Sequence, residues 1–100
     1  MPNSYQLTTR AVDDLSEIWN YTFDTWSETQ ADRYYQMLLG HCQDVADGLV
    51  VGKPYADVLP GLFGSAIGQH IIFYHQVQED LIEIVRILHG RMDLRKRLTP

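Results

Sequence analysis

The chain has 100 residues, 45% of them hydrophobic, and its 13 acidic and 8 basic residues give a net charge of −5. These values are typical of one folded domain and exclude a disordered chain, so we expect a single domain over residues 1–100. The acidic balance argues against general nucleic-acid binding, which needs a basic surface. The single cysteine, Cys42, has no partner for an internal disulfide, which fits a reducing compartment.

The sequence has no signal-peptide pattern and no apolar run long enough to cross a bilayer. We therefore expect a cytoplasmic protein that does not bind membranes.

The first predicted elements are a short strand and a helix. Alternating apolar residues indicate a strand that ends at Thr8, and Thr9 is the expected N-cap of a helix of about 17 residues. Asp13 and Asp14 fall near its start, where the helix dipole favours acidic groups. The predicted apolar stripe comprises Val12, Leu15, Ile18, Trp19, Thr22, Phe23 and Trp26.

A second helix follows almost at once. Ser27 to Gln30 has the form of a capping box, and Gly48 and Gly52 mark the predicted end of this helix. Because the connection is so short, we expect the two helices to form an antiparallel hairpin. The stripe of the second helix comprises Ala31, Tyr34, Tyr35, Leu38, Cys42, Val45, Ala46 and Leu49.

The second half of the chain predicts a loop and then strands. Residues 53–60 are bounded by prolines, and strand-like segments cover roughly 61–67, 69–77 and 80–88, with turns tight enough to make them antiparallel. Ile82, Ile84 and Leu88 are expected to share the core-facing side of the last strand. The predicted fold is α+β in the order β-α-α-β-β-β, with the helical hairpin packed on a small antiparallel sheet.

The sequence offers little support for catalysis or metal binding. His70 and His75 lie an odd number of residues apart on one strand, so they point to opposite faces, whereas a metal site needs three or four converging ligands. Cleavage of RNA needs cationic groups around the phosphate, but residues 61–85 contain no Lys or Arg. We therefore expect no catalytic residue, no metal and no cofactor.

The positive charge is concentrated at the C-terminal end. Residues 86–100 hold five basic residues and one acidic residue, whereas residues 1–85 hold three basic and twelve acidic residues. One hypothesis is a docking element for an acidic or nucleic-acid-bound partner, and the alternative is a solvated terminal turn that aids solubility.

Several motifs together resemble the ParE branch of the RelE/ParE toxins of bacterial type II toxin–antitoxin systems. They are Asp14-Leu15 with Ile18 and Trp19, the segment Gln30 to Tyr34, Pro60-Gly61-Leu62, the segment His70 to Tyr74, and the segment Ile84 to His89 with Met92-Asp93. The resemblance covers nearly the whole chain. It departs from the family pattern at Phe63, Ser65 and Ile67, in a region where many members carry arginine.

The resemblance implies the same fold and a function that composition does not give. ParE-like toxins are not enzymes; they poison DNA gyrase by stabilising a complex with cleaved DNA, and so block replication. A cognate antitoxin, partly disordered when free, wraps its C-terminal region around the toxin and neutralises it. The resemblance also implies a higher-order toxin–antitoxin assembly, in which the antitoxin rather than the toxin reads the DNA sequence.

Two sets of candidate residues follow. The target-binding candidates are Arg86, His89, Arg91, Met92, Asp93, Arg95, Lys96 and Arg97. The antitoxin-binding candidates are Tyr21, Trp26, Tyr34 and Tyr55. The alternatives are a ribosome-dependent mRNA endonuclease of the RelE type, which would use Arg86 and His89, and a non-toxic interaction module.

Overall fold

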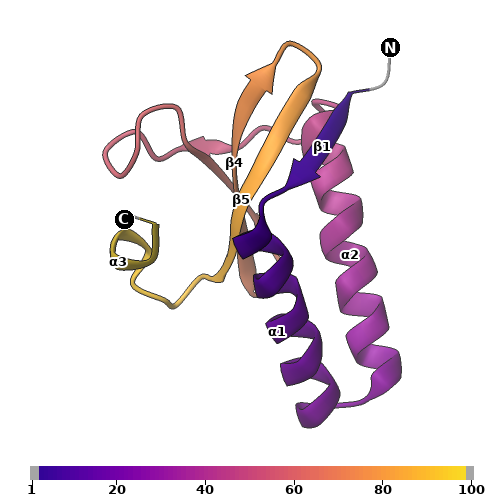
Figure 1. The fold of residues 1–100 in the computed structure, drawn as a ribbon. Helices are drawn as coiled ribbons and strands as arrows, with labels where there is room; N and C mark the ends of the chain where they lie inside the picture. The colour runs from indigo at the N-terminus through magenta and orange to yellow at the C-terminus, as the bar shows by residue number, and fades with distance from the viewer. Residues whose placement is uncertain (1–2, 99–100) are drawn as a thin grey trace.

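The computed structural model describes residues 3–98, in which a helical hairpin covers one face of a five-stranded sheet (Figure 1). The elements are β1 (Ser4–Leu7), α1 (Thr9–Thr25), α2 (Glu28–Ala46), β2 (Lys53–Pro54), β3 (Phe63–Ile67), β4 (His70–Gln78), β5 (Leu81–His89) and α3 (Leu94–Leu98). The strand order is β1-β5-β4-β3-β2. The predicted α+β fold is confirmed, but the sheet is mixed, because β1 lies parallel to β5 whereas the other pairs are antiparallel.

The junction between β1 and α1 is fixed by one threonine. The N-cap of α1 is Thr8 rather than the predicted Thr9, since the Thr8 hydroxyl accepts a hydrogen bond from the Ala11 backbone N–H at 3.1 Å. The same hydroxyl donates to the Val85 carbonyl at 2.9 Å, and the Thr8 N–H donates to the Ile84 carbonyl at 3.0 Å. Thr8 therefore caps the helix and anchors its start to β5.

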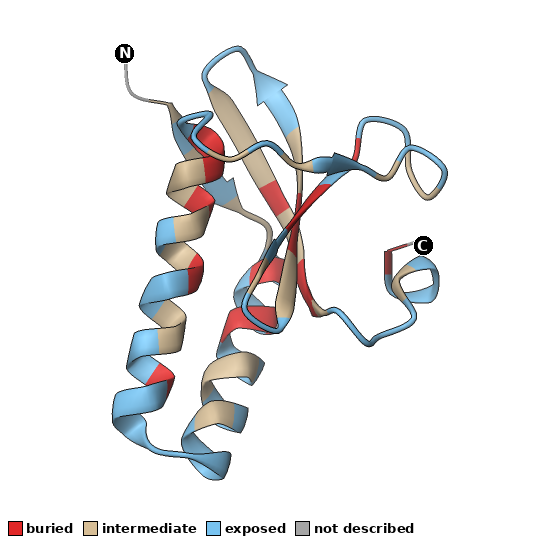
Figure 2. Ribbon diagram, turned by 180° about the vertical axis from the view of Figure 1, so that it is seen from behind, coloured by how far each residue is buried: buried red, intermediate tan, exposed pale blue. Residues whose placement is uncertain are grey.

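The helices bury only part of the apolar stripes that periodicity predicts. In α2 the predicted residues Ala31, Leu38, Cys42, Val45 and Ala46 are buried, and the Ser27 cap is confirmed. Leu49 was wrongly assigned to this stripe, because the helix ends at Ala46 and Leu49 is exposed. In α1, by contrast, Val12 and Phe23 are each 45% exposed. For Phe23 the reason is its place near the end of α1, because the far end of the hairpin extends beyond the sheet (Figure 2).

A bulge in β5 changes which residues face the helices. Phe73 pairs with Arg86 but Tyr74 pairs with Ile84, so Val85 is an extra residue in the ladder. The prediction that Leu88 shares a face with Ile84 was therefore wrong, since one added residue reverses the alternation.

The sheet has a buried core on each face. The core under the helices consists of Ala11, Leu15, Leu38, Cys42, Ile72, Ile84 and Ile87. The second core consists of Leu62, Phe73, Leu88 and Leu98, and it is covered by the loop that precedes β3 and by α3. That loop begins with β2, a two-residue edge strand in a segment predicted as loop, where proline is tolerated because no further strand needs its missing N–H. No helix among residues 3–98 is long and apolar enough to cross a membrane.

Candidate functional site

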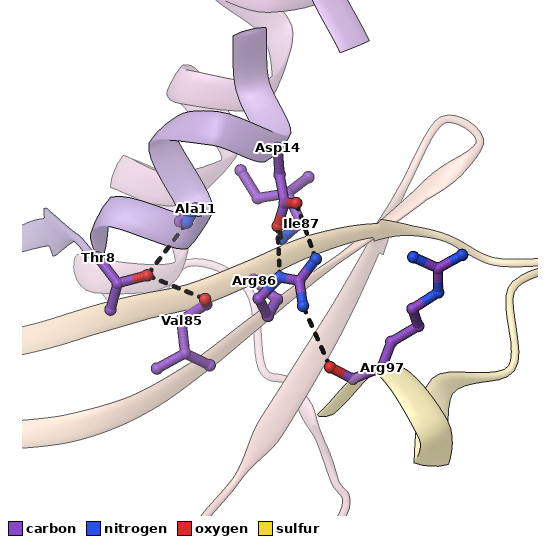
Figure 3. A network of polar contacts seen from close by, with 7 residues as sticks. All are labelled: Thr8, Ala11, Asp14, Val85, Arg86, Ile87 and Arg97. Carbon is purple, nitrogen blue, oxygen red and sulfur yellow. Dashed lines mark hydrogen bonds and ion pairs between the residues drawn. The ribbon is translucent and has the colours of Figure 1, made fainter. Parts of the chain in front are cut away.

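An ion pair joins α1 to the free edge of β5 (Figure 3). The Arg86 Nε and Nη2 atoms donate to the two carboxylate oxygens of Asp14 at 2.8 and 2.9 Å. Strand β1 pairs with β5 only as far as Ile84, and beyond that point the Ile87 N–H donates to Asp14 at 2.9 Å. The carboxylate therefore takes the place of a neighbouring strand.

The same guanidinium holds the C-terminal helix. Arg86 Nη1 donates to the Arg97 backbone carbonyl at 3.1 Å. The hydrogen bonds to Asp14 raise the pKa of Arg86 above its ordinary value. Arg86 was a target-binding candidate; all three of its guanidinium nitrogens form hydrogen bonds within the fold, one of them to the backbone of α3.

Helix α3 and the turn before it present the remaining cations of the C-terminal segment to solvent. The Leu98 side chain is 9% exposed in the second core, and the Asp93 carboxylate accepts from the Lys96 N–H at 3.3 Å. Arg95 lies 3.4 Å from the exposed Asp57 carboxylate. We call the exposed side chains of Arg91, Arg95, Lys96 and Arg97 the basic surface. The end of the basic segment, residues 99–100, lies outside the described residues.

The other target-binding candidates lie at the start of this segment. The His89 Nδ1 accepts a hydrogen bond from the Arg91 N–H at 3.1 Å, and Met92 is 40% exposed. Six of the eight candidates thus lie in the segment from Arg91 to Arg97, His89 precedes it at the end of β5, and Arg86 is held by Asp14 and donates to the Arg97 carbonyl.

One antitoxin-binding candidate forms a polar contact between α2 and β4. The Tyr34 hydroxyl lies 2.6 Å from the His70 Nδ1 and accepts from the Gln69 N–H at 3.0 Å. The His70 ring lies edge-on to the His89 ring, with 5.4 Å between centroids. Burial, with a smaller contribution from His89, lowers the pKa of His70 to about 4. The Tyr34 hydroxyl thus forms its contacts within the fold, with His70 and Gln69.

The remaining antitoxin-binding candidates fall into two environments. Tyr55 packs edge-on against Phe73 in the second core, with 5.2 Å between ring centroids. Tyr21 and Trp26, by contrast, are 69% and 70% exposed near the far end of the helical hairpin. Phe23 is exposed on the same part of α1, and we call Tyr21, Phe23 and Trp26 the aromatic tip.

The other reactive side chains have structural contacts. His75 pairs with Glu83 at 2.9 Å and lowers the pKa of that carboxyl, and the His41 Nε2 lies 2.8 Å from the Ser65 hydroxyl. Cys42 is fully buried, which raises its pKa to about 12 and leaves it without nucleophilic character. Within residues 3–98, no group of three or more His, Cys, Asp or Glu side chains is placed to hold a metal ion.

Comparison with known proteins gives consistent matches. A family model described as the ParE toxin of the type II toxin–antitoxin system, parDE, matches residues 5–94. The chain is 34% identical over 98 residues to Toxin ParE1 of Mycobacterium tuberculosis strain H37Rv, covering 98% of this chain and 100% of that protein. It is 33% identical over 94 residues to Toxin ParE1 of Caulobacter vibrioides, covering 94% of this chain and 96% of that one.

Two solved structures share the fold. A chromosomal ParDE toxin–antitoxin system from P. aeruginosa aligns with a TM-score of 0.71 at 22% identity, over 88% of this chain and 96% of that chain. The toxin–antitoxin complex RelBE2 from Mycobacterium tuberculosis aligns with a TM-score of 0.53 at 23% identity, over 89% and 99% of the two chains.

Proposed function

The chain belongs to the ParE toxins of type II toxin–antitoxin systems, and from this membership we propose that it inhibits DNA gyrase and is neutralised by an antitoxin encoded beside it. The observation that carries the proposal is the family match over residues 5–94, which extends from β1 to the first residue of α3. Because gyrase acts on the chromosome, the proposal places the protein in the cytoplasm.

Inhibition without catalysis is supported by the second core. In RelE-like relatives, RNA cleavage uses basic residues on the sheet. Here the sheet face opposite the helices is filled by Leu62, Phe73 and Leu88, and residues 61–85 contain no Lys or Arg. Arg86 is already bound to Asp14. A nuclease on this face would lack the cations that stabilise a phosphate in the transition state.

The basic surface is the proposed contact with gyrase. Arg95, Lys96 and Arg97 lie on a helix that is anchored by Leu98 and by the Arg86 bond, and Arg91 lies in the turn before that helix. A gyrase complex that holds cleaved DNA carries many phosphate charges, and a cluster of exposed Lys and Arg residues complements them.

The aromatic tip is a proposed contact with the antitoxin. Exposed aromatic side chains on a helical hairpin suit an amphipathic partner segment that folds as it binds. The two structural relatives are described as a toxin–antitoxin system and a toxin–antitoxin complex, which supports such a partner. We extend the proposal to a higher-order assembly with that antitoxin.

The proposal is tested by expressing the chain in cells without its antitoxin and following DNA synthesis, protein synthesis and transcript integrity. Gyrase inhibition predicts that DNA synthesis stops first and that messages stay intact. Ribosome-linked cuts in messages would instead identify an endonuclease. Normal growth at a good soluble yield would identify a non-toxic interaction module.

A further inference from the structure

A groove lies between the C-terminal end of α2 and the turn that joins β4 to β5, two segments at the same end of the molecule (Figure 1). Its volume is about 310 Å³. The apolar part of its lining consists mainly of Val45, Val50, Val51, Phe63, Tyr74 and Ile82. Nothing in the sequence pattern predicted it, because it forms where elements distant in the sequence end.

The groove lies where the β4–β5 hairpin extends beyond the C-terminal end of α2 at Ala46 (Figure 1). The segment that follows α2 is held by a hydrogen bond of 3.0 Å from the Gly52 N–H to the Tyr74 hydroxyl, and a Cβ at Gly52 would overlap that hydroxyl. This arrangement leaves Val51 91% exposed beside the groove.

The rim of the groove is acidic. Glu79 and Asp80 line it, and no Lys or Arg does. Within residues 3–98, neither carboxylate forms a hydrogen bond or an ion pair. Two unpaired like charges on adjacent residues repel each other, and a cation placed near both would relieve that repulsion.

We propose that this groove binds a segment of the antitoxin that carries apolar side chains next to Lys or Arg residues. The apolar side chains bury Val51 and Phe63, and the cation pairs with Glu79 and Asp80. The inference rests on the proposed function, and it adds the site and the chemistry of the segment that occupies it.

Binding of the purified antitoxin from the adjacent reading frame tests the proposal. We expect Val51→Glu to weaken binding by about tenfold or more, since it puts a charge into an apolar contact. The double variant E79Q/D80N should weaken binding and reduce its dependence on salt. The matched controls are Ala56→Glu, on an exposed loop, and D13N/E17Q, on the exposed side of α1; both should bind like the wild type.

The outcomes separate the two proposals. If the wild type binds the antitoxin and the groove variants bind it equally well, the groove is not the binding site, and the proposed function is unaffected. Failure of the wild type to bind the antitoxin would overturn both.

A labelling experiment provides a second readout that is independent of affinity. Because Cys42 is fully buried, a Val51→Cys variant carries a single accessible thiol. We expect the antitoxin to slow maleimide labelling at this position by about tenfold, and to leave labelling of Ala56→Cys unchanged. Equal labelling rates at Val51→Cys with and without antitoxin would contradict the proposal.

Discussion

Asp14 on α1 and Arg86 on β5 lie 72 residues apart and form a double hydrogen-bonded ion pair at 2.8 and 2.9 Å. The pair is largely buried, with side-chain exposures of 12% for Arg86 and 10% for Asp14. Through the third nitrogen of Arg86, it also reaches the backbone of α3. One contact thus links the helical hairpin, the sheet and the proposed target-binding helix.

Asp14→Asn should destabilise the fold strongly. Removing the negative charge leaves the Arg86 guanidinium buried without compensation, and we expect a loss of about 3 kcal/mol in the free energy of unfolding. Urea unfolding measures it. The matched control is Asp13→Asn at the exposed neighbouring position, where the change should stay within about 0.5 kcal/mol. Similar losses in the free energy of unfolding of both variants would mean that the ion pair contributes no more to stability than the exposed Asp13 carboxylate does.

Neutralising the basic surface should reduce toxicity while the fold persists. The triple variant R91Q/K96Q/R97Q changes only exposed side chains, and the bond from Arg86 is made to a backbone carbonyl, so unfolding should change little. Inhibition of the target should weaken by about tenfold or more. The control is R10Q/R33Q/K53Q, which removes the same charge from residues 1–85. Equal effects of the two triple variants on growth would exclude a local role for α3.

Leu98→Ala should loosen α3 from the sheet. Its side chain is buried beside Phe73 and Leu88, and truncation should cost about 2 kcal/mol of stability. Toxicity should fall as well, because the basic surface loses its anchor. Leu49→Ala, at a position that is 75% exposed, should leave both unchanged. Full toxicity of Leu98→Ala at its normal expression level would show that docking of α3 is dispensable.

Acid should destabilise the protein through His70. Its pKa is lowered from 6.5 to about 4 in the fold, so between these values the unfolded chain binds more protons. This contribution to stability is complete above pH 6.5 and is lost as the pH falls toward 4. We therefore expect the free energy of unfolding to fall as the pH is lowered through this range. Urea unfolding at pH 7 and pH 5 should give a smaller difference for His70→Gln than for the wild type, and equal differences would contradict the assignment.

The four antitoxin-binding candidates should separate into two classes. Tyr21→Ala and Trp26→Ala should weaken antitoxin binding without changing the melting temperature, because both side chains are exposed. Tyr55→Ala should lower the melting temperature, because its ring packs in the second core. Tyr34→Phe should also lower it, through loss of the His70 contact. Unchanged binding by Tyr21→Ala and Trp26→Ala would remove the aromatic tip from the interface.

Local patterns predicted most of the elements. The capping residue Ser27 and the stripe of α2 were found because capping and helical periodicity are properties of neighbouring residues. Helix α3 was not predicted, although a local signal was present, since Leu94 and Leu98 lie four residues apart and both pack on the second core.

Contacts between residues far apart in the chain could not be predicted from the sequence. Nothing near Asp14 indicates a partner on β5, and nothing near Val85 marks the extra residue of a bulge. For the same reason Arg86 was assigned to the target, although the fold uses its guanidinium. Tyr34 and Tyr55 look like Tyr21 in the sequence, and only packing distinguishes them.

Gyrase inhibition is tested by supercoiling of relaxed plasmid by purified gyrase, with this protein added in increasing amounts. We predict that supercoiling falls and that linear DNA accumulates once the gyrase is denatured, with R91Q/K96Q/R97Q less effective than the wild type. Normal supercoiling and no cleaved DNA at a large excess of the protein would exclude gyrase as its target.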